Sequence, residues 1–212
     1  MYKEKLDAYI DAHKENMLED LKKLVRIDSQ KGEAMPGKPF GEGPAKVLDA
    51  AEEMIKEYGF TTTNYDHYVV AADFSDQEKK LDILAHLDVV PVTKNWKETE
   101  PFEPIIKDGK IYGRGTADDK GPAIAAIYAM RAIKECGVPL NNSMRLILGS
   151  DEECGSADLK YYYAREKEAP MSFTPDADFP VINLEKGRLQ KEFTQKLDAG
   201  NSGAAVVKIQ AG

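Results

Sequence analysis

The segment from Leu81 to Pro91 constrains the fold of this chain more than any other. It is an almost continuous apolar run that ends in His86-Leu87-Asp88 and then meets a proline. Such a run is typical of a strand buried on both faces in a parallel sheet. Because open α/β sheets bind ligands beyond the carboxyl ends of their strands, His86 is expected where a ligand would lie. Asp88 points the same way in an extended chain and can orient the His86 ring. For these two residues alone, a solvated pair at a surface turn remains the simpler interpretation.

Helical and strand-like patterns alternate along the first 187 residues. We expect helices over residues 3–26, from Pro44 to Tyr58, over 123–136, and from an N-cap at Ser156 to about Lys167. Strands are expected at 68–72, 81–86 and 144–149, with a hairpin at 105–112 that turns at Asp108-Gly109. This alternation predicts an α/β fold with a mainly parallel or mixed sheet flanked by helices.

The composition is that of a globular acidic protein. The 212 residues include 37 Asp and Glu against 29 Lys and Arg, which gives a net charge of −8. We expect no nucleic-acid partner, because no basic cluster is interleaved with aromatic residues. We also expect no membrane partner, because no apolar run is long enough to span a bilayer. Cys136 and Cys154 form no disulfide framework, which favours a cytoplasmic location. The oligomeric state stays open.

Ligand-type residues stand at four successive strand ends or glycine-rich turns. They are His86 with Asp88, Asp118 with Asp119, Glu152 with Glu153, and Asp176 with Asp178. Zinc binds histidine nitrogen and carboxylate oxygen, and two metal ions can share one carboxylate. Each pair alone also has an ordinary explanation, such as an acidic helix N-terminus, a solvated loop or a turn. Four pairs at successive strand ends favour a metal centre.

Three blocks of the sequence carry a family resemblance. They are LAHLDVVP at 84–91, GRGTADDKG at 113–121 and SDEECGS at 150–156. These blocks resemble the zinc metallopeptidase family that includes carboxypeptidase G, aminoacylase, carnosinase and succinyl-diaminopimelate desuccinylase, and within it the bacterial peptidase V dipeptidases. The resemblance covers most of residues 1–187, which would form the N-terminal part of a zinc-peptidase-like catalytic domain. Residues 188–212 would then begin an incomplete α+β lid domain.

The resemblance implies two zinc ions, with manganese or cobalt possible because their ligand chemistry overlaps. The implied metal ligands are His86, Asp118, Glu153 and Asp176, with Asp118 bridging the two ions. Asp88 would orient His86, and Glu152 would be the general acid/base. The resemblance further implies that the peptide bond after Asp118 is cis and that Asp119 is a neighbour, not a ligand.

The implied activity is hydrolysis of dipeptides through a hydroxide that bridges the two metal ions. A related amidohydrolase, acting on N-acyl amino acids or succinylated substrates, and a non-catalytic metal-binding fragment are the alternatives. The family's second metal also takes a histidine from far downstream, whereas this chain has only His13, His67 and His86. We therefore expect an N-terminal fragment with impaired or no activity.

Overall fold

The computed structural model describes residues 2–178, 181–184, 186–187 and 189. Residues 1–176 form one compact unit, and residues 177–212 are grouped into a second unit. Apart from Leu189, the expected beginning of a lid domain at 188–212 lies outside the described residues.

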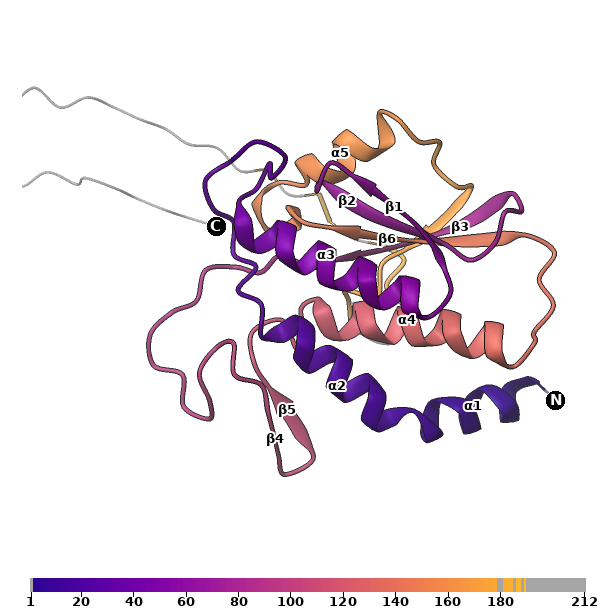
Figure 1. The fold of residues 1–212 in the computed structure, drawn as a ribbon, viewed down its shortest axis with the longest axis horizontal. Helices are drawn as coiled ribbons and strands as arrows, with labels where there is room; N and C mark the ends of the chain where they lie inside the picture. Colours follow the sequence, from indigo (N-terminus) through magenta and orange to yellow (C-terminus); the bar gives the residue numbers. More distant parts are fainter. Residues whose placement is uncertain (1, 179–180, 185, 188, 190–212) are drawn as a thin grey trace, which may run out of the picture. The chain divides into compact units, whose positions relative to one another are not determined.

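A five-stranded mixed sheet carries this unit (Figure 1). Its strands are β1 (Thr61–Tyr65), β2 (Val69–Asp73), β3 (Lys79–His86), β6 (Ser143–Gly149) and β7 (Met171–Phe173). They are ordered β1-β2-β6-β3-β7. The pairs β6–β3 and β3–β7 are parallel, whereas β1–β2 and β2–β6 are antiparallel. The predicted mixed sheet is confirmed, and the apolar run that ends at His86 lies between two parallel neighbours.

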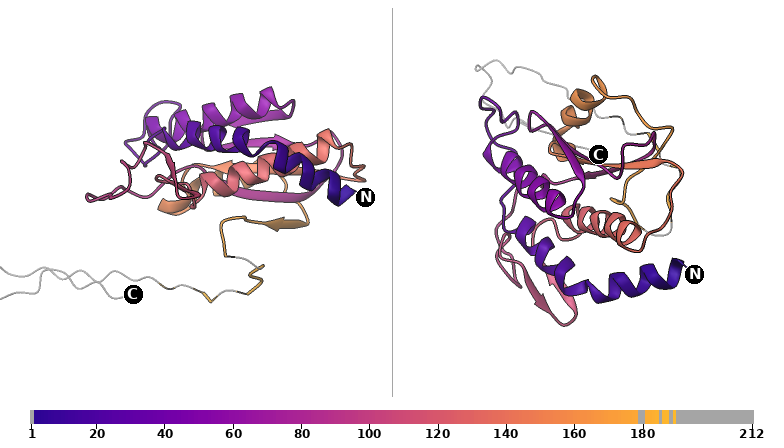
Figure 2. Two further views of the ribbon diagram at one scale, coloured as in Figure 1. Left: turned by 90° about the horizontal axis from the view of Figure 1, so that it is seen from below. Right: turned by 45° about the vertical axis from the view of Figure 1, so that its right-hand side comes forward.

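Helices cover both faces of the sheet. They are α1 (Tyr2–Ala12), α2 (Lys14–Val25), α3 (Glu42–Glu57), α4 (Lys120–Glu135) and α5 (Ala157–Tyr163), with a 3₁₀ turn at Glu152–Cys154. Helices α2, α3 and α4 share one core with one face of the sheet, and Figure 2 shows this helical layer. Tyr162 of α5 packs against the opposite face. Among the described residues, no helix is long and apolar enough to cross a membrane.

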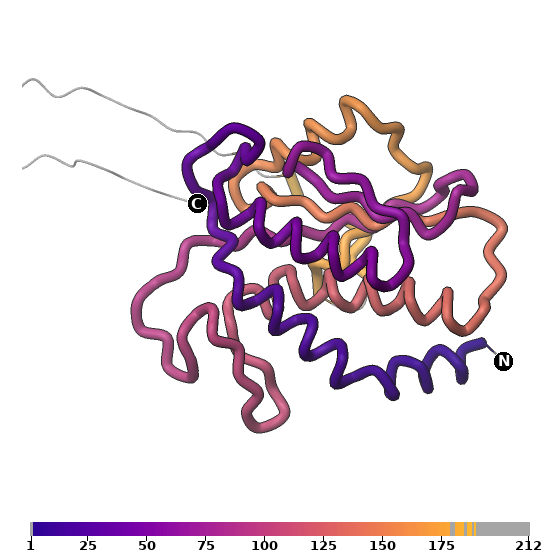
Figure 3. Tube along the Cα trace, viewed as in Figure 1, coloured from indigo at the N-terminus to yellow at the C-terminus, as the bar shows by residue number. Residues whose placement is uncertain are grey.

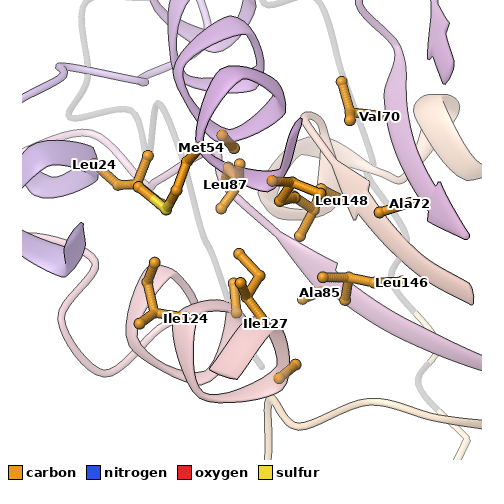
Figure 4. Close-up of a cluster of buried hydrophobic side chains, with 14 of the residues drawn as sticks. Leu24, Met54, Val70, Ala72, Ala85, Leu87, Ile124, Ile127, Leu146 and Leu148 are labelled. Carbon is orange, nitrogen blue, oxygen red and sulfur yellow. The ribbon is translucent and has the colours of Figure 1, made fainter. Parts of the chain in front are cut away.

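The alternation of side chains along each strand explains why two cores form. On β2, Val70 and Ala72 face the helical layer, whereas Val69 and Ala71 face α5. The larger core joins Leu24 and Ile124 of the helices to the sheet (Figure 4). Both faces of the central strands are therefore buried, as the nearly unbroken apolar runs predict.

A long connection leads from β3 to α4 and returns the chain to the end of the sheet (Figure 3). It includes the hairpin of β4 (Ile105–Lys107) and β5 (Lys110–Tyr112). Asp108 and Gly109 have φ angles of 52° and 72°, as a type I′ turn requires. The predicted hairpin is confirmed.

Two predicted helices differ from the structure. The helix expected over 3–26 is broken at His13, whose Nδ1 lies 2.7 Å from the carbonyl oxygen of Tyr9 and whose ring stacks on the Tyr9 ring. Ser156 occupies the predicted N-cap position of α5, but it has φ 53° and its side chain makes no capping hydrogen bond. The Asp151 carboxylate accepts the Ala157 N–H instead. Helix α5 also ends at Tyr163, short of the expected Lys167.

Candidate metal centre

The parallel strands deliver the predicted site residues to one edge of the sheet. His86 is the last residue of β3 and pairs with Gly149, the last residue of β6. Glu152 follows β6 by three residues, and Asp176 follows β7 by three. Asp118 approaches from the turn before α4. Such a convergence at the carboxyl ends of parallel strands is where α/β folds bind ligands.

Three carboxylates face one ring nitrogen of His86. Its Nε2 lies 3.0 Å from Asp118 Oδ1, 3.4 Å from Asp176 Oδ2 and 3.9 Å from Glu152 Oε2. The His86 side chain is only 4% exposed, whereas that of Asp118 is 60% exposed and open to solvent. His86, Asp118 and Asp176 form a group in which the donor atoms lie within 4.8 Å of one another.

The buried carboxylate of Asp88 holds the other side of the His86 ring. Its Oδ1 lies 3.4 Å from Nδ1 of His86, and its backbone oxygen lies 3.1 Å from the same nitrogen. Asp88 Oδ1 also accepts the backbone N–H of Glu152, and Oδ2 accepts that of Glu153. Asp88 therefore contacts both the histidine and the turn that carries Glu152 and Glu153, which we call the acidic turn.

The acidic turn after β6 is fixed by two further buried carboxylates. Asp158 Oδ2 accepts the backbone N–H groups of Ser150 and Asp151 at 2.6 and 3.0 Å. The Asp151 side chain pairs with Lys31, with Oδ1 2.6 Å from Nζ. A Cβ on Gly149 would lie 2.4 Å from Asp158 Oδ2, so only glycine leaves room for this arrangement.

The turn before α4 contains the cis peptide bond expected between Asp118 and Asp119. Asp119 is fully buried, and its Oδ2 accepts the backbone N–H of His86 at 3.0 Å. The ammonium group of Lys120, also fully buried, donates to the carbonyl oxygens of Leu24 and Ile27. These bonds tie the turn to β3 on one side and to the end of α2 on the other.

Burial and the crowding of carboxylates shift the pKa values of the site. Burial works to lower the pKa of His86, but the carboxylate of Asp88, followed by those of Asp119 and Glu152, outweighs it and raises the pKa to about 10. Burial raises the pKa of Asp119 to about 7. Burial, reinforced by the neighbouring carboxylates, also raises the pKa values of Glu152 and Glu153.

This donor set fits a divalent cation. One Nε2 proton cannot serve the carboxylates of Asp118, Asp176 and Glu152 at once, so like charges are left facing each other. Imidazole nitrogen with carboxylate oxygen is the ligand chemistry of zinc and related metals. A cation among these atoms would offset the repulsion between the carboxylates.

The structure brings together most of the residues that the sequence analysis singled out. His86, Asp118 and Asp176 form the donor group, Glu152 lies beside it, and Asp88 contacts His86. Glu153 stands in the same turn but lies outside the three-residue group. Asp178 belongs to the second unit.

Sequence reasoning missed several residues that support the site. They are Lys31, Asp82, Lys120, Arg145, Asp151 and Asp158, all of them charged and most of them buried. Lys120 could have been noticed, because the ammonium group of a lysine at the start of a buried apolar helix needs hydrogen-bond acceptors. Lys31 and Asp151 are 120 residues apart, and no local pattern links them.

Comparisons with known proteins identify the family of this chain. The model of the family "Peptidase family M20/M25/M40" matches residues 83–198. The chain is 41% identical over 176 residues, 82% of its length, to "Putative dipeptidase YtjP" of Bacillus subtilis (strain 168). It is 36% identical over 205 residues, 95% of its length, to the Beta-Ala-Xaa dipeptidase of Lactobacillus delbrueckii subsp. lactis.

Solved structures show the same fold. Human carnosine dipeptidase 1 matches 77% of this chain with a TM-score of 0.66 and 27% identity. The match covers 37% of the human chain, and the bacterial matches span 38% and 43% of the relatives' lengths. With the family model covering more than half of its residues, this chain belongs to the peptidase family M20/M25/M40.

Proposed function

We propose that this chain carries part of the catalytic centre of a metal-dependent dipeptidase that hydrolyses the peptide bond of dipeptides. Asp118, Asp176 and Glu152 converge on Nε2 of His86, and this convergence supports the proposal most strongly. The names of the matched relatives, two dipeptidases of bacteria and one of human origin, support dipeptides as the substrate class.

His86 and Asp176 would hold one metal ion, Asp118 would bridge to a second, and Glu153 would bind that second ion. We propose zinc as the metal. The bound metal supplies Lewis-acid polarisation of a water molecule and of the substrate carbonyl. Asp88 fixes the orientation of the His86 ring, so that Nε2, once deprotonated, would present its lone pair to the metal.

Glu152 acts as the general acid/base. It accepts a proton from the attacking water and delivers that proton to the nitrogen of the leaving amine. Three features support this role: the carboxylate is half exposed, it stands 3.9 Å from Nε2 of His86, and burial raises its pKa above the usual glutamate value. The two backbone bonds from the acidic turn to Asp88 keep the Glu152 side chain at the donor group.

Neither His13 nor His67 is free to replace the downstream histidine that the family resemblance implies for the second metal. His13 is held by Tyr9, and His67 bridges Gly37 and Asp49 with both ring nitrogens. We therefore propose one tight metal site, one weak site and a low rate of hydrolysis for the 212-residue chain. Within it, residues 1–187 would belong to the catalytic domain and 188–212 to a lid. Two free cysteines support a reducing, cytoplasmic location.

The test compares two substrate classes with the purified chain and added zinc, manganese or cobalt. A panel of dipeptides and a panel of N-acetyl and N-succinyl amino acids are incubated with the chain and with the His86→Ala variant. We expect slow release of amino acids from dipeptides only, removed by a chelator and absent in His86→Ala. This variant also controls for contaminating peptidases.

Two results would contradict the proposal. Faster turnover of the acylated amino acids would assign the chain to the related amidohydrolases. Metal binding with no hydrolysis of either class would identify a non-catalytic metal-binding fragment.

A further inference from the structure

A buried ion pair joins the two central parallel strands. Asp82 of β3 and Arg145 of β6 are cross-strand partners, and their side chains are 0% and 6% exposed. The guanidinium group donates from Nε and Nη2 to the two carboxylate oxygens, both at 2.9 Å. This bidentate contact is the strongest geometry available to such a pair.

The same pair reaches the chain segment that precedes β7. Arg145 Nη2 donates to the carbonyl oxygen of Lys167 at 3.0 Å, and Asp82 Oδ2 accepts the backbone N–H of Ala169 at 3.0 Å. The Tyr163 hydroxyl also donates to Asp82 Oδ2. One ion pair therefore contacts the backbone just before β7 as well as linking β3 to β6.

Within the part of the chain that the structure describes, little else fixes the register of strand β7. It pairs with β3 through only three residues, and all three of its side chains are exposed. Register is weakly specified where no face of a strand is buried, and a shift of one residue turns every side chain to the other face. Met171 and Phe173, at 59% and 48% exposure, supply no buried anchor.

The register of β7 decides where Asp176 lies. Leu81 pairs with Met171 and Ile83 with Phe173. Continued in register, this pairing brings residue 176 opposite His86, in agreement with the 3.4 Å between Asp176 Oδ2 and His86 Nε2. A one-residue shift would move Asp176 by about 3.3 Å along the strand and reverse its direction.

We propose that Asp82 and Arg145 are positioning residues that lock the register of β3, β6 and β7 and thereby hold Asp176 beside His86. This inference rests on the proposed function of His86 and Asp176 as metal ligands. Neither residue of the pair touches the donor group. A pair that acted only on stability would leave the metal affinity of the folded chain unchanged.

The test uses two substitutions in the 212-residue chain. Asp82→Asn weakens the ion pair with Arg145 at nearly constant side-chain volume. The double variant Asp82→Leu/Arg145→Met removes the ion pair without leaving a buried unpaired charge, so that folding is retained. Asp20→Asn is the matched control, since Asp20 is an equally buried carboxylate that binds Tyr128 in the helical layer.

Two measurements are made on each variant. The first is the set of nuclear Overhauser contacts between Leu81 and Met171 and between Ile83 and Phe173, recorded without metal. The second is the zinc affinity by calorimetry, repeated in the Asp176→Ala background. We expect the double variant to lose the β3–β7 contacts and about 10- to 100-fold in zinc affinity, as for other residues that support a metal ligand. In the Asp176→Ala background the same substitutions should have no further effect.

The outcomes separate this inference from the proposed function. Retained β3–β7 contacts with unchanged zinc affinity in the double variant would overturn the inference that Asp82 and Arg145 fix the register of β7. An equal loss of affinity in the Asp176→Ala background, or in Asp20→Asn, would overturn it as well. Absence of zinc binding by the unmodified chain would overturn the proposed function, while the β3–β7 contacts would still decide whether Asp82 and Arg145 fix the register of β7.

Discussion

The carboxylate of Asp88 accepts a hydrogen bond from the backbone N–H of Glu152, with 3.2 Å between Oδ1 and the nitrogen. The two residues are 64 positions apart, at the ends of the adjacent strands β3 and β6. The same carboxylate accepts the N–H of Glu153 and faces Nδ1 of His86. A single buried side chain thus couples the proposed metal-binding histidine to the turn that bears the proposed base.

Replacing Asp88 by asparagine tests this coupling. The introduced amide would retain one acceptor oxygen, but its NH₂ group would face a backbone N–H donor in place of the second oxygen. We expect Asp88→Asn to lower zinc affinity by about 10- to 100-fold. Calorimetric titration measures the loss, and Asp20→Asn controls for the removal of a buried carboxylate. An unchanged affinity would show that Asp88 does not orient His86.

Glu152→Gln separates proton transfer from metal binding. Because Glu152 is proposed to move protons and not to bind metal, the variant should keep the zinc affinity of the unmodified chain. Its rate of dipeptide hydrolysis should fall by about 10²- to 10⁴-fold, the usual contribution of a general acid/base. The rate and the zinc affinity are measured on the same preparation. Retained hydrolysis would assign the proton transfer to another group.

Asp20 gives a prediction about stability and its dependence on pH. Burial works to raise the pKa of Asp20, but hydrogen bonds from Tyr58, Lys23 and Tyr128 outweigh it and lower the pKa. Since the folded-state pKa lies below the unfolded value, the stabilisation is complete above the unfolded pKa of about 4 and is lost as the pH falls through the folded-state pKa. Asp20→Asn should cost about 1–3 kcal/mol of unfolding free energy at neutral pH.

Urea unfolding of the unmodified chain and of Asp20→Asn, at neutral pH and in acid, checks this expectation. The difference in unfolding free energy should shrink as the pH falls below about 4. A difference that stays constant with pH would mean that the ionised carboxylate is not the stabilising form.

Gly121 tests the close packing of the turn before α4. A Cβ at this position would lie 2.1 Å from the backbone oxygen of Thr116, which cannot move without displacing the turn. Gly121→Ala should therefore destabilise the chain by about 1–3 kcal/mol, as overpacking does elsewhere. Gly32→Ala is the control, since its nearest neighbour would lie 3.8 Å away. Equal unfolding midpoints for the two variants would contradict the expectation.

The sequence predicted the parts of the fold that local patterns encode. The apolar run ending at His86 became a central parallel strand, and Asp108-Gly109 became the turn of a hairpin. These features have local signals in the sequence: a run of apolar residues indicates burial, and an Asp-Gly pair indicates a turn. The three sequence blocks that resemble a metallopeptidase family predicted the family of this chain, and the comparisons confirm it.

Features that depend on distant contacts were not predictable in the same way. The helical period continues through His13, so nothing in the pattern marks the break that the Tyr9 contact accompanies. Strand β7 is short and exposed, which leaves no periodic signal. Asp82 stands inside an apolar strand, and its partner Arg145 is 63 residues away. Polar side chains that fix the register of strands become visible only when the strands are paired.

We propose that His86, Asp118 and Asp176 hold a metal ion. The most direct test is anomalous X-ray diffraction at the zinc absorption edge from crystals of the chain grown with zinc. We predict an anomalous peak about 2.0–2.2 Å from His86 Nε2 and from carboxylate oxygens of Asp118 and Asp176. An ordered structure with no peak among these three side chains, or with zinc bound only elsewhere, would contradict it.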